Sequence, residues 1–283
     1  MRRQHATPTP SLQPRPPIGN GVGYSDGPGR GWTCYRPPPM EPSLIGPLRV
    51  HARGGDDHRG GGDGPAILLC HGFGAPGEDL VSLCRVVDAG RGVRWFFPEA
   101  PLEVEVGPGI RGRAWWDIGM DRLMALVMRG DIDGAMKRLD EVPDGLAPAR
   151  DALAATIDAL EKHHGVKRDR LVVGGFSQGA MVTTELVTHL REPFAGLAVL
   201  SGTRLGGDRW QEGFEALGER LSALVSHGRR DPLLPFGRAE ILRDMMTTAK
   251  ARVTWVPHGG AHEIPQGVVS ALGTFAKERL GGA

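Results

Sequence analysis

The segment 171–190 constrains the fold of this chain more than any other, because it joins a strand, a sharp turn and a helix. The run RLVV favours a buried strand, and the apolar period after residue 178 is typical of a helix. Between them lies GGFSQGA, in which Gly175, Ser177 and Gly179 form the pattern Gly-x-Ser-x-Gly. Glycines two residues to either side allow a serine to sit on a strained strand-to-helix turn. The segment therefore predicts that Ser177 is an exposed nucleophile at the end of a sheet.

Short apolar runs alternate with helical periods from residue 44 onward. The expected strands cover residues 48–52, 66–70, 93–97, 171–174, 196–201, 221–226 and 253–256. The expected helices cover residues 78–87, 149–163, 178–190, 237–249 and 266–280. This alternation predicts an α/β fold with a mostly parallel sheet and helices on both faces. The first two strands are joined by GGDDHRGGGDG, which is too short for a crossover helix, so we expect them to form an antiparallel hairpin.

The N-terminal part of the 283-residue chain differs from the rest. Residues 1–47 hold eleven of the 23 prolines, and PRPP and RPPPM interrupt any regular period. We expect 1–47 to be a disordered Pro/Gly-rich extension, with a docking arm as the alternative, and 48–283 to be one catalytic domain. Met40 precedes the first apolar run and is an alternative start of translation.

Charge and cysteine usage narrow the class of partner. The 34 Lys+Arg against 33 Asp+Glu give a net charge of +1, so no overall field attracts nucleic acid or an anionic membrane, and we expect a small-molecule partner. Cys34, Cys70 and Cys84 are odd in number and lack metal-ligand spacing, which argues against a disulfide framework and a metal site. The chain has no apolar run of 18 residues, so we expect no stable membrane insertion and a cytoplasmic location. No pattern indicates an oligomeric state.

A serine hydroxyl needs an adjacent base, and this type of fold supplies its partners in the order Ser, acid, His. Asp231 follows the strand LSALVSHG at its carboxyl end, where His227 supports the turn; an ordinary Asp-Pro turn is the alternative. After the next strand, the loop PHGGAHEIP contains two histidines. His262 lies at the far end of this glycine-rich loop and has the reach to act as the base, whereas His258 is the alternative.

Two backbone amides are candidates for an oxyanion hole. The first is the N–H of Gln178, directly after the serine. The second is the N–H of Phe73 in LLCHGFGAPGEDL, where the chain turns sharply after a buried strand. An ordinary glycine-rich turn is the alternative for this loop.

Seven short motifs between residue 66 and the C-terminus occur together: HGFGAPGEDL, FFPEAP, RAWWDI, GGFSQGA, LSG, HGRRDPLLP and AHEIP. This set resembles the phospholipase/carboxylesterase family, which includes the acyl-protein thioesterases. The resemblance implies a minimal α/β-hydrolase domain that needs no cofactor and cleaves ester or thioester bonds. It implies a triad of Ser177, Asp231 and His262, with Phe73 and Gln178 as oxyanion donors.

Two other functions remain as alternatives. Lactone and dienelactone hydrolases have a similar layout but favour Cys where this chain has Ser177. A non-catalytic binding protein of the same fold would lack a member of the triad, and none is lacking here.

The segment 119–146 is longer than in the compact members of that family and is rich in Leu and Met, including Leu126 and Met128. We expect it to be a mobile lid whose apolar face lines an acyl groove, with a packed helical insertion as the alternative. Trp115 and Trp116 precede it and are expected to form a wall of the groove, with a place in the core as the alternative.

Overall fold

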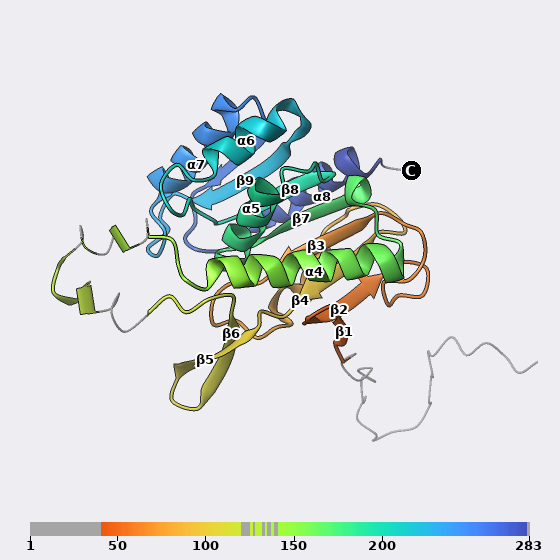
Figure 1. Ribbon diagram of the computed structural model, residues 1–283, viewed down its shortest axis with the longest axis horizontal. Coiled ribbons are helices and arrows are strands. Elements are labelled where there is room, and N and C mark those ends of the chain that lie inside the picture. The colour runs from red at the N-terminus through yellow and green to blue at the C-terminus, as the bar shows by residue number, and fades with distance from the viewer. Residues whose placement is uncertain are drawn as a thin grey trace, which may run out of the picture. The chain divides into compact units, whose positions relative to one another are not determined.

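The computed structural model describes residues 41–119, 125–126, 128–131, 134, 137–138 and 141–281 (Figure 1). Its main element is an eight-stranded sheet in the order β1-β2-β4-β3-β7-β8-β9-β10. All neighbours from β4 to β10 are parallel, whereas β2 is antiparallel to both β1 and β4. The strands are β1 (Ser43–Ile45), β2 (Leu48–Gly54), β3 (Ala66–Cys70), β4 (Arg94–Pro98), β7 (Leu171–Phe176), β8 (Gly196–Leu200), β9 (Ser222–Gly228) and β10 (Arg252–His258). The expected mostly parallel sheet is confirmed.

The pairing of the first strands differs from the expectation in one respect. The antiparallel hairpin joins β2 to β1, not to β3, and residues 43–45 were expected to belong to the N-terminal extension. The predicted pairing of 48–52 with 66–70 is wrong, because β4 lies between these two strands. The intervening loop does not act as a simple hairpin turn: the Asp57 carboxylate accepts the N–H groups of Arg59 and Gly61, and Gly55 N–H donates to the carbonyl of Val93.

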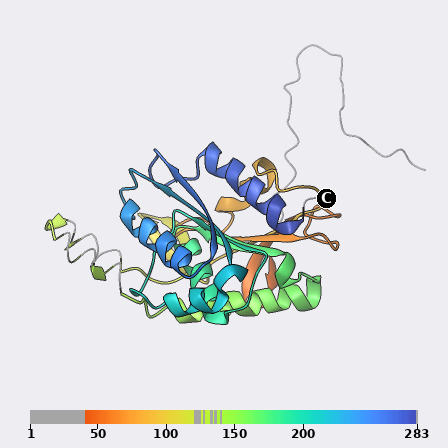
Figure 2. The ribbon, with the colours of Figure 1, turned by 90° about the horizontal axis from the view of Figure 1, so that it is seen from above.

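Helices cover both faces of the sheet (Figure 2). α4 (Leu146–His164), α5 (Gln178–Leu190), α6 (Gln211–Leu217) and α7 (Phe236–Thr248) contribute buried side chains to one face, and α1 (Leu83–Val86) and α8 (Gln266–Leu280) to the other. Short 3-10 turns occur at Asp79–Ser82, Arg168–Arg170 and Gly218–Arg220. The helices expected at 178–190 and 266–280 are confirmed to the residue. The helix expected at 78–87 is a 3-10 turn followed by a single α-helical turn.

Strand β3 shows how the two faces are separated. Successive side chains of a strand point to opposite faces. Leu68 and Cys70 belong to the core cluster that includes buried residues of α4 and α5, whereas Ile67 and Leu69 belong to the cluster that includes buried residues of α8, and all four are at most 1% exposed. The central strands are therefore apolar on both sides, and their polar chemistry is confined to their ends.

A second, two-stranded sheet was not anticipated. β5 (Leu102–Gly107) and β6 (Ile110–Ala114) form an antiparallel hairpin that lies beyond the end of β4. It is attached to the loop after β3: Gly74 N–H donates to the carbonyl of Arg113 at 2.8 Å, and Arg113 N–H donates to the carbonyl of Ala75 at 2.9 Å. The hairpin thus fixes the loop in which an oxyanion donor was expected.

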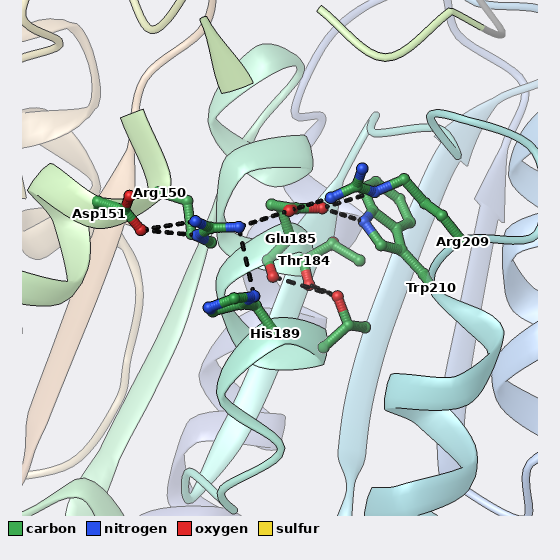
Figure 3. Close-up of polar contacts among 8 residues, drawn as sticks. Arg150, Asp151, Thr184, Glu185, His189, Arg209 and Trp210 are labelled. Atoms are coloured by element: carbon green, nitrogen blue, oxygen red, sulfur yellow. Dashed lines mark hydrogen bonds and ion pairs between the residues drawn. The ribbon is translucent and has the colours of Figure 1, made fainter. Parts of the chain in front are cut away.

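A buried carboxylate connects three helical segments (Figure 3). The side chain of Glu185, in α5, is 1% exposed. It accepts hydrogen bonds from Trp210 Nε1 at 2.6 Å, from Arg209 Nε at 3.2 Å and from Arg150 Nη1, on α4, at 3.3 Å. Arg209 Nη2 also contacts it. Because a buried carboxylate needs such partners, this cluster holds α4, α5 and the start of α6 in one arrangement.

Candidate active site

Ser177 lies between the end of β7 and the start of α5. Its backbone has φ 55° and ψ −119°, outside the regions that L-residues ordinarily adopt. Its N–H donates to the carbonyl of Leu200 at the end of β8, 2.9 Å away, so this conformation is held by the neighbouring strand. A strained turn of this kind points to a functional role and places the serine at the positive end of a helix.

The two flanking glycines are required by close packing. A Cβ atom at Gly175 or at Gly179 would overlap the carbonyl oxygen of Cys70, at the end of β3. Backbone atoms cannot move aside without disturbing the central sheet. The pattern Gly-x-Ser-x-Gly therefore allows the turn to sit against the neighbouring strand.

The structure brings Asp231 and His262 together, although they are 31 positions apart in the sequence. His262 Nδ1 lies 2.7 Å from Asp231 Oδ2, and the Asp231 side chain is fully buried. The other carboxylate oxygen, Oδ1, accepts the N–H groups of Leu233 and Leu234 at 2.9 Å each. The carboxylate is an acceptor, so Nδ1 of His262 carries the hydrogen and Nε2 is free to accept a proton.

The environment keeps Asp231 ionised. Burial alone raises the pKa of this carboxyl, but the hydrogen bond from His262 and the amides of Leu234 and Leu233 outweigh it and lower the pKa below its ordinary value. A carboxylate that is charged at neutral pH can orient an imidazole and stabilise its protonated form.

An aromatic contact packs His262 next to the strand-to-helix turn at Ser177. Its ring centroid lies 4.7 Å from that of Phe176, the residue directly before Ser177. His258, the alternative base, has a different local role: its Nδ1 accepts the N–H of Gly260 at 3.3 Å. Of the two histidines, His262 is thus the one joined to the acid and packed against the serine turn.

The loop after β3 approaches the serine from the other side. A Cβ atom at Gly72 would lie 3.3 Å from the Cβ of Ser177. Within the part of the chain that the structure describes, the N–H of Phe73 has no acceptor, while the next two amides are bonded to the carbonyls of Arg113 and Gly72. An unpaired N–H beside the serine is suited to hold a negatively charged oxygen.

His71 holds this loop, a role that sequence reasoning missed. Its Nε2 accepts the N–H of Ala100 at 3.0 Å, so its Nδ1 must carry the hydrogen that is donated to the carbonyl of Gly72 at 2.8 Å. Burial lowers the pKa of His71, even though the bond to Gly72 acts in the opposite direction. A neutral imidazole with a fixed tautomer therefore sets the loop geometry.

The side chain of Gln178 has a second role beside its backbone N–H. Its Oε1 accepts the N–H of Trp115 at 2.8 Å, and its Nε2 donates to the carbonyl of Trp116 at 2.9 Å. Trp115 Nε1 in turn donates to the carbonyl of His71 at 2.9 Å. Trp115 and Trp116 are 1% and 2% exposed, so their burial favours the core interpretation over a groove wall.

The expected lid falls only partly on the described residues. Within the segment 119–146, Leu126 is half-buried and Met128 is 84% exposed. Its other apolar residues expected to face a groove (Leu123, Met124, Val127, Met136 and Leu139) lie outside the described residues. The lid hypothesis stays a prediction.

Two other kinds of site are absent from the described part of the chain. No group of three or more His, Cys, Asp or Glu side chains within it is arranged to hold a metal ion. No helix among these residues combines the length and apolar character needed to cross a bilayer.

Two acyl-protein thioesterases are similar to this chain in sequence. Acyl-protein thioesterase 1 of Schizosaccharomyces pombe is 27% identical over 170 residues, which is 60% of this chain and 69% of that protein. Acyl-protein thioesterase 1 of Emericella nidulans is 29% identical over 194 residues, which is 63% of this chain and 76% of that protein.

Solved structures agree on the fold. The Bacillus cereus carboxylesterase has a TM-score of 0.62 at 19% identity, over 82% of this chain and 94% of its own. Esterase PE8 has a TM-score of 0.63 at 22% identity, over 82% and 99%. The α/β-hydrolase fold expected from the sequence is confirmed. The Phospholipase/Carboxylesterase family matches residues 61–279, and the chain belongs to this family.

Proposed function

We propose that the chain cleaves carboxylic ester or thioester bonds through an acyl-enzyme on Ser177. As a member of the phospholipase/carboxylesterase family, it is a carboxylic ester hydrolase. The observation that carries the assignment of residues is the 2.7 Å contact between His262 Nδ1 and Asp231 Oδ2, beside a serine held at φ 55°. This pairing leaves Nε2 of His262 free to accept a proton, and the imidazole packs against Phe176, the residue directly before Ser177.

In the first half of the reaction, Ser177 Oγ attacks the acyl carbon while His262 Nε2 takes the hydroxyl proton. Asp231 keeps the imidazole in the required tautomer and stabilises its positive charge. The C–O or C–S bond to the leaving group then breaks, and His262 returns the proton to the departing alcohol or thiol. In the second half, water attacks the acyl-enzyme with His262 again as the base, which releases the acid and restores Ser177.

The oxyanion of each tetrahedral intermediate is held by the N–H groups of Phe73 and Gln178. Gln178 is the first residue of α5, and the first amides of a helix have no acceptor within it. Removing one donor from such a site lowers the rate by about 10²- to 10³-fold. The loop 71–74 thus matters nearly as much to turnover as the charged residues do.

The substrate is a small-molecule or lipid-like acyl ester or thioester. Two of the known relatives are acyl-protein thioesterases, which extends the proposal to thioesters. A cytoplasmic location is part of the proposal, because Cys70 and Cys84 are free thiols, as a reducing compartment keeps them.

The assignment of Ser177 is tested with a fluorophosphonate probe and a p-nitrophenyl ester. We expect Ser177→Ala to lose both labelling and turnover. Ser270→Ala, an exposed serine in α8, is the matched control and should retain both. Labelling that persists in Ser177→Ala would show that another residue is the nucleophile. Running the same assay with acyl thioesters ranks the two kinds of bond.

We also propose that the segment 119–146 contacts the acyl chain. Each methylene that it buries would contribute about 0.8 kcal/mol, so kcat/KM should rise from acetyl to medium-chain esters. Leu126→Asp combined with Met128→Asp should flatten this rise and spare acetyl turnover. A variant that loses thermal stability but keeps its chain-length preference would show that the segment is a packed insertion.

A further inference from the structure

His227 is buried directly behind the proposed acid. It lies near the end of β9, its side chain is fully buried, and its Nε2 is 3.3 Å from Asp231 Oδ2. The same nitrogen is 2.8 Å from the carbonyl oxygen of Leu234. His227 therefore contacts both ends of the turn 231–234, whose first residue is the acid.

The hydrogen-bond partners of His227 fix its tautomer. A carbonyl oxygen only accepts, so Nε2 must carry the hydrogen that is donated to Leu234. Nδ1 is buried and has no hydrogen-bond partner in the described part of the chain. The uncharged form with hydrogen on Nε2 is thus the one that satisfies these contacts.

The contacts form a continuous path from β9 to the carboxylate. His227 Nε2–H holds the carbonyl of Leu234, and the N–H of the same residue holds Asp231 Oδ1. On the other side, His227 Nε2 lies against Oδ2, the oxygen that also receives His262 Nδ1. A carboxylate that is constrained at both oxygens cannot rotate away from His262.

We propose that His227 is a positioning residue of the hydrolase, which holds the Asp231 carboxylate in the orientation that fixes the tautomer of His262. This inference rests on the proposed function. It assigns His227 an effect on kcat through Asp231, with no contact to the substrate.

The surroundings of His227 agree with an uncharged positioning group. Burial lowers the pKa of His227, while the hydrogen bond to Leu234 and the charge of Asp231 act in the opposite direction; His262 and His258 lower the pKa further. On the α7 side, the ring of Phe236 lies 6.2 Å from the imidazole, with the Arg229 guanidinium above that ring. An uncharged His227 leaves the negative charge of Asp231 to the imidazolium of His262.

The test compares His227→Leu, which removes the donor, with His227→Gln, whose amide nitrogen can occupy the position of Nε2. We expect His227→Leu to lower kcat on a p-nitrophenyl ester by about 10- to 100-fold with little change in KM. Loss of a residue that orients a functional side chain through a hydrogen bond has effects of this size at other sites. His227→Gln should recover most of the loss. The low-field proton resonance of the His262 Nδ1–H donated to Asp231 should weaken or shift in His227→Leu and return in His227→Gln.

Leu242→Ala is the matched stability control, because Leu242 is fully buried in α7 and belongs to the hydrophobic core. It should lower the thermal midpoint and leave kcat and the resonance unchanged. If His227→Leu does not fold, His227→Asn, which moves the donor away from Nε2, takes its place and should remain impaired where His227→Gln is active. Wild-type kcat and an unchanged resonance in folded His227→Leu or His227→Asn would overturn the inference. Turnover by Ser177→Ala in the same series would instead refute the proposed function.

Discussion

Glu185→Gln should destabilise the fold, because this carboxylate is the shared anion of two arginines at a site that water scarcely reaches. The substitution keeps the shape of the side chain and removes its charge. Arg150 and Arg209 then face a neutral amide, and Trp210 keeps at most one acceptor (Figure 3). Removing one partner of a buried ion pair is strongly destabilising because it leaves the other charge uncompensated.

The size of the effect follows from the exposure of the arginines. Breaking a buried pair costs about 3–5 kcal/mol. The Arg209 side chain is 35% exposed, and Arg150 keeps a second ion pair with Asp151 at 2.7 Å. Both cations thus retain part of their stabilisation, so we expect a loss of unfolding free energy at the lower end of that range, about 3 kcal/mol. In a domain of this size 1 kcal/mol corresponds to about 2–4 °C, which gives a fall in Tm of about 6–12 °C.

The assay is thermal unfolding followed by circular dichroism or calorimetry. Glu192→Gln is the matched control: Glu192 accepts from Arg168 Nη1 at 2.8 Å, but its side chain is 58% exposed. Exposed pairs contribute about 0–1 kcal/mol, so its Tm should barely change. If Glu185→Gln lowers Tm no more than Glu192→Gln does, the two arginines find other partners and the argument from buried charge is wrong.

Three further predictions concern the site. His262→Ala should lower kcat by several orders of magnitude, whereas His258→Ala should lower it only slightly. Steady-state kinetics of both variants check this, and a larger loss of kcat in His258→Ala would identify His258 as the base. Gly179→Ala should lower the free energy of unfolding by more than the roughly 1–3 kcal/mol of ordinary overpacking, because its Cβ would meet backbone; Gly237→Ala, in open space on α7, should not lower it, and thermal unfolding of both variants checks this. The lowered pKa of Asp231 contributes stability that is present above its unfolded pKa of about 4 and is lost as pH falls through the folded value. The Tm difference between wild type and Asp231→Asn should therefore shrink as pH falls from 5 to 3, and a constant difference would contradict it.

The parts of the fold that the sequence predicts well are those specified locally. The helix at 178–190 begins at a turn whose glycines are visible in the sequence, and its boundaries agree with α5 to the residue. The insertion of β4 between β2 and β3 depends on pairing between distant strands, which no local period encodes. Strand β5 alternates in sequence as LEVEVG, but Leu102 and Val106 are 41% and 45% exposed, so the hairpin lacks the buried face that makes a strand recognisable.

The same distinction applies to the site. The order of Ser177, Asp231 and His262 along the chain, and the position of each at the end of a strand, can be found from the sequence because each is a local feature. The role of His71 cannot, and for His227 the sequence indicates support of the turn at Asp231 but not which ring nitrogen faces the carboxylate. Both depend on which nitrogen carries the hydrogen, and that is set by partners from other segments or turns, such as the N–H of Ala100 for His71.

The proposed oxyanion donors are joined by one network, so neither acts as an independent part. Gln178, whose N–H is one donor, holds the N–H of Trp115 through its side chain. Trp115 holds the carbonyl of His71 through its indole, and His71 holds the carbonyl of Gly72, directly before Phe73, whose N–H is the other donor. The backbone of the serine turn and that of the loop after β3 are thus fixed relative to each other by buried hydrogen bonds. Because a displacement of 1 Å in such a site can lower a rate by about 10²-fold, we expect the buried Trp115 to affect turnover by holding the two proposed donors in place, without contact to the substrate.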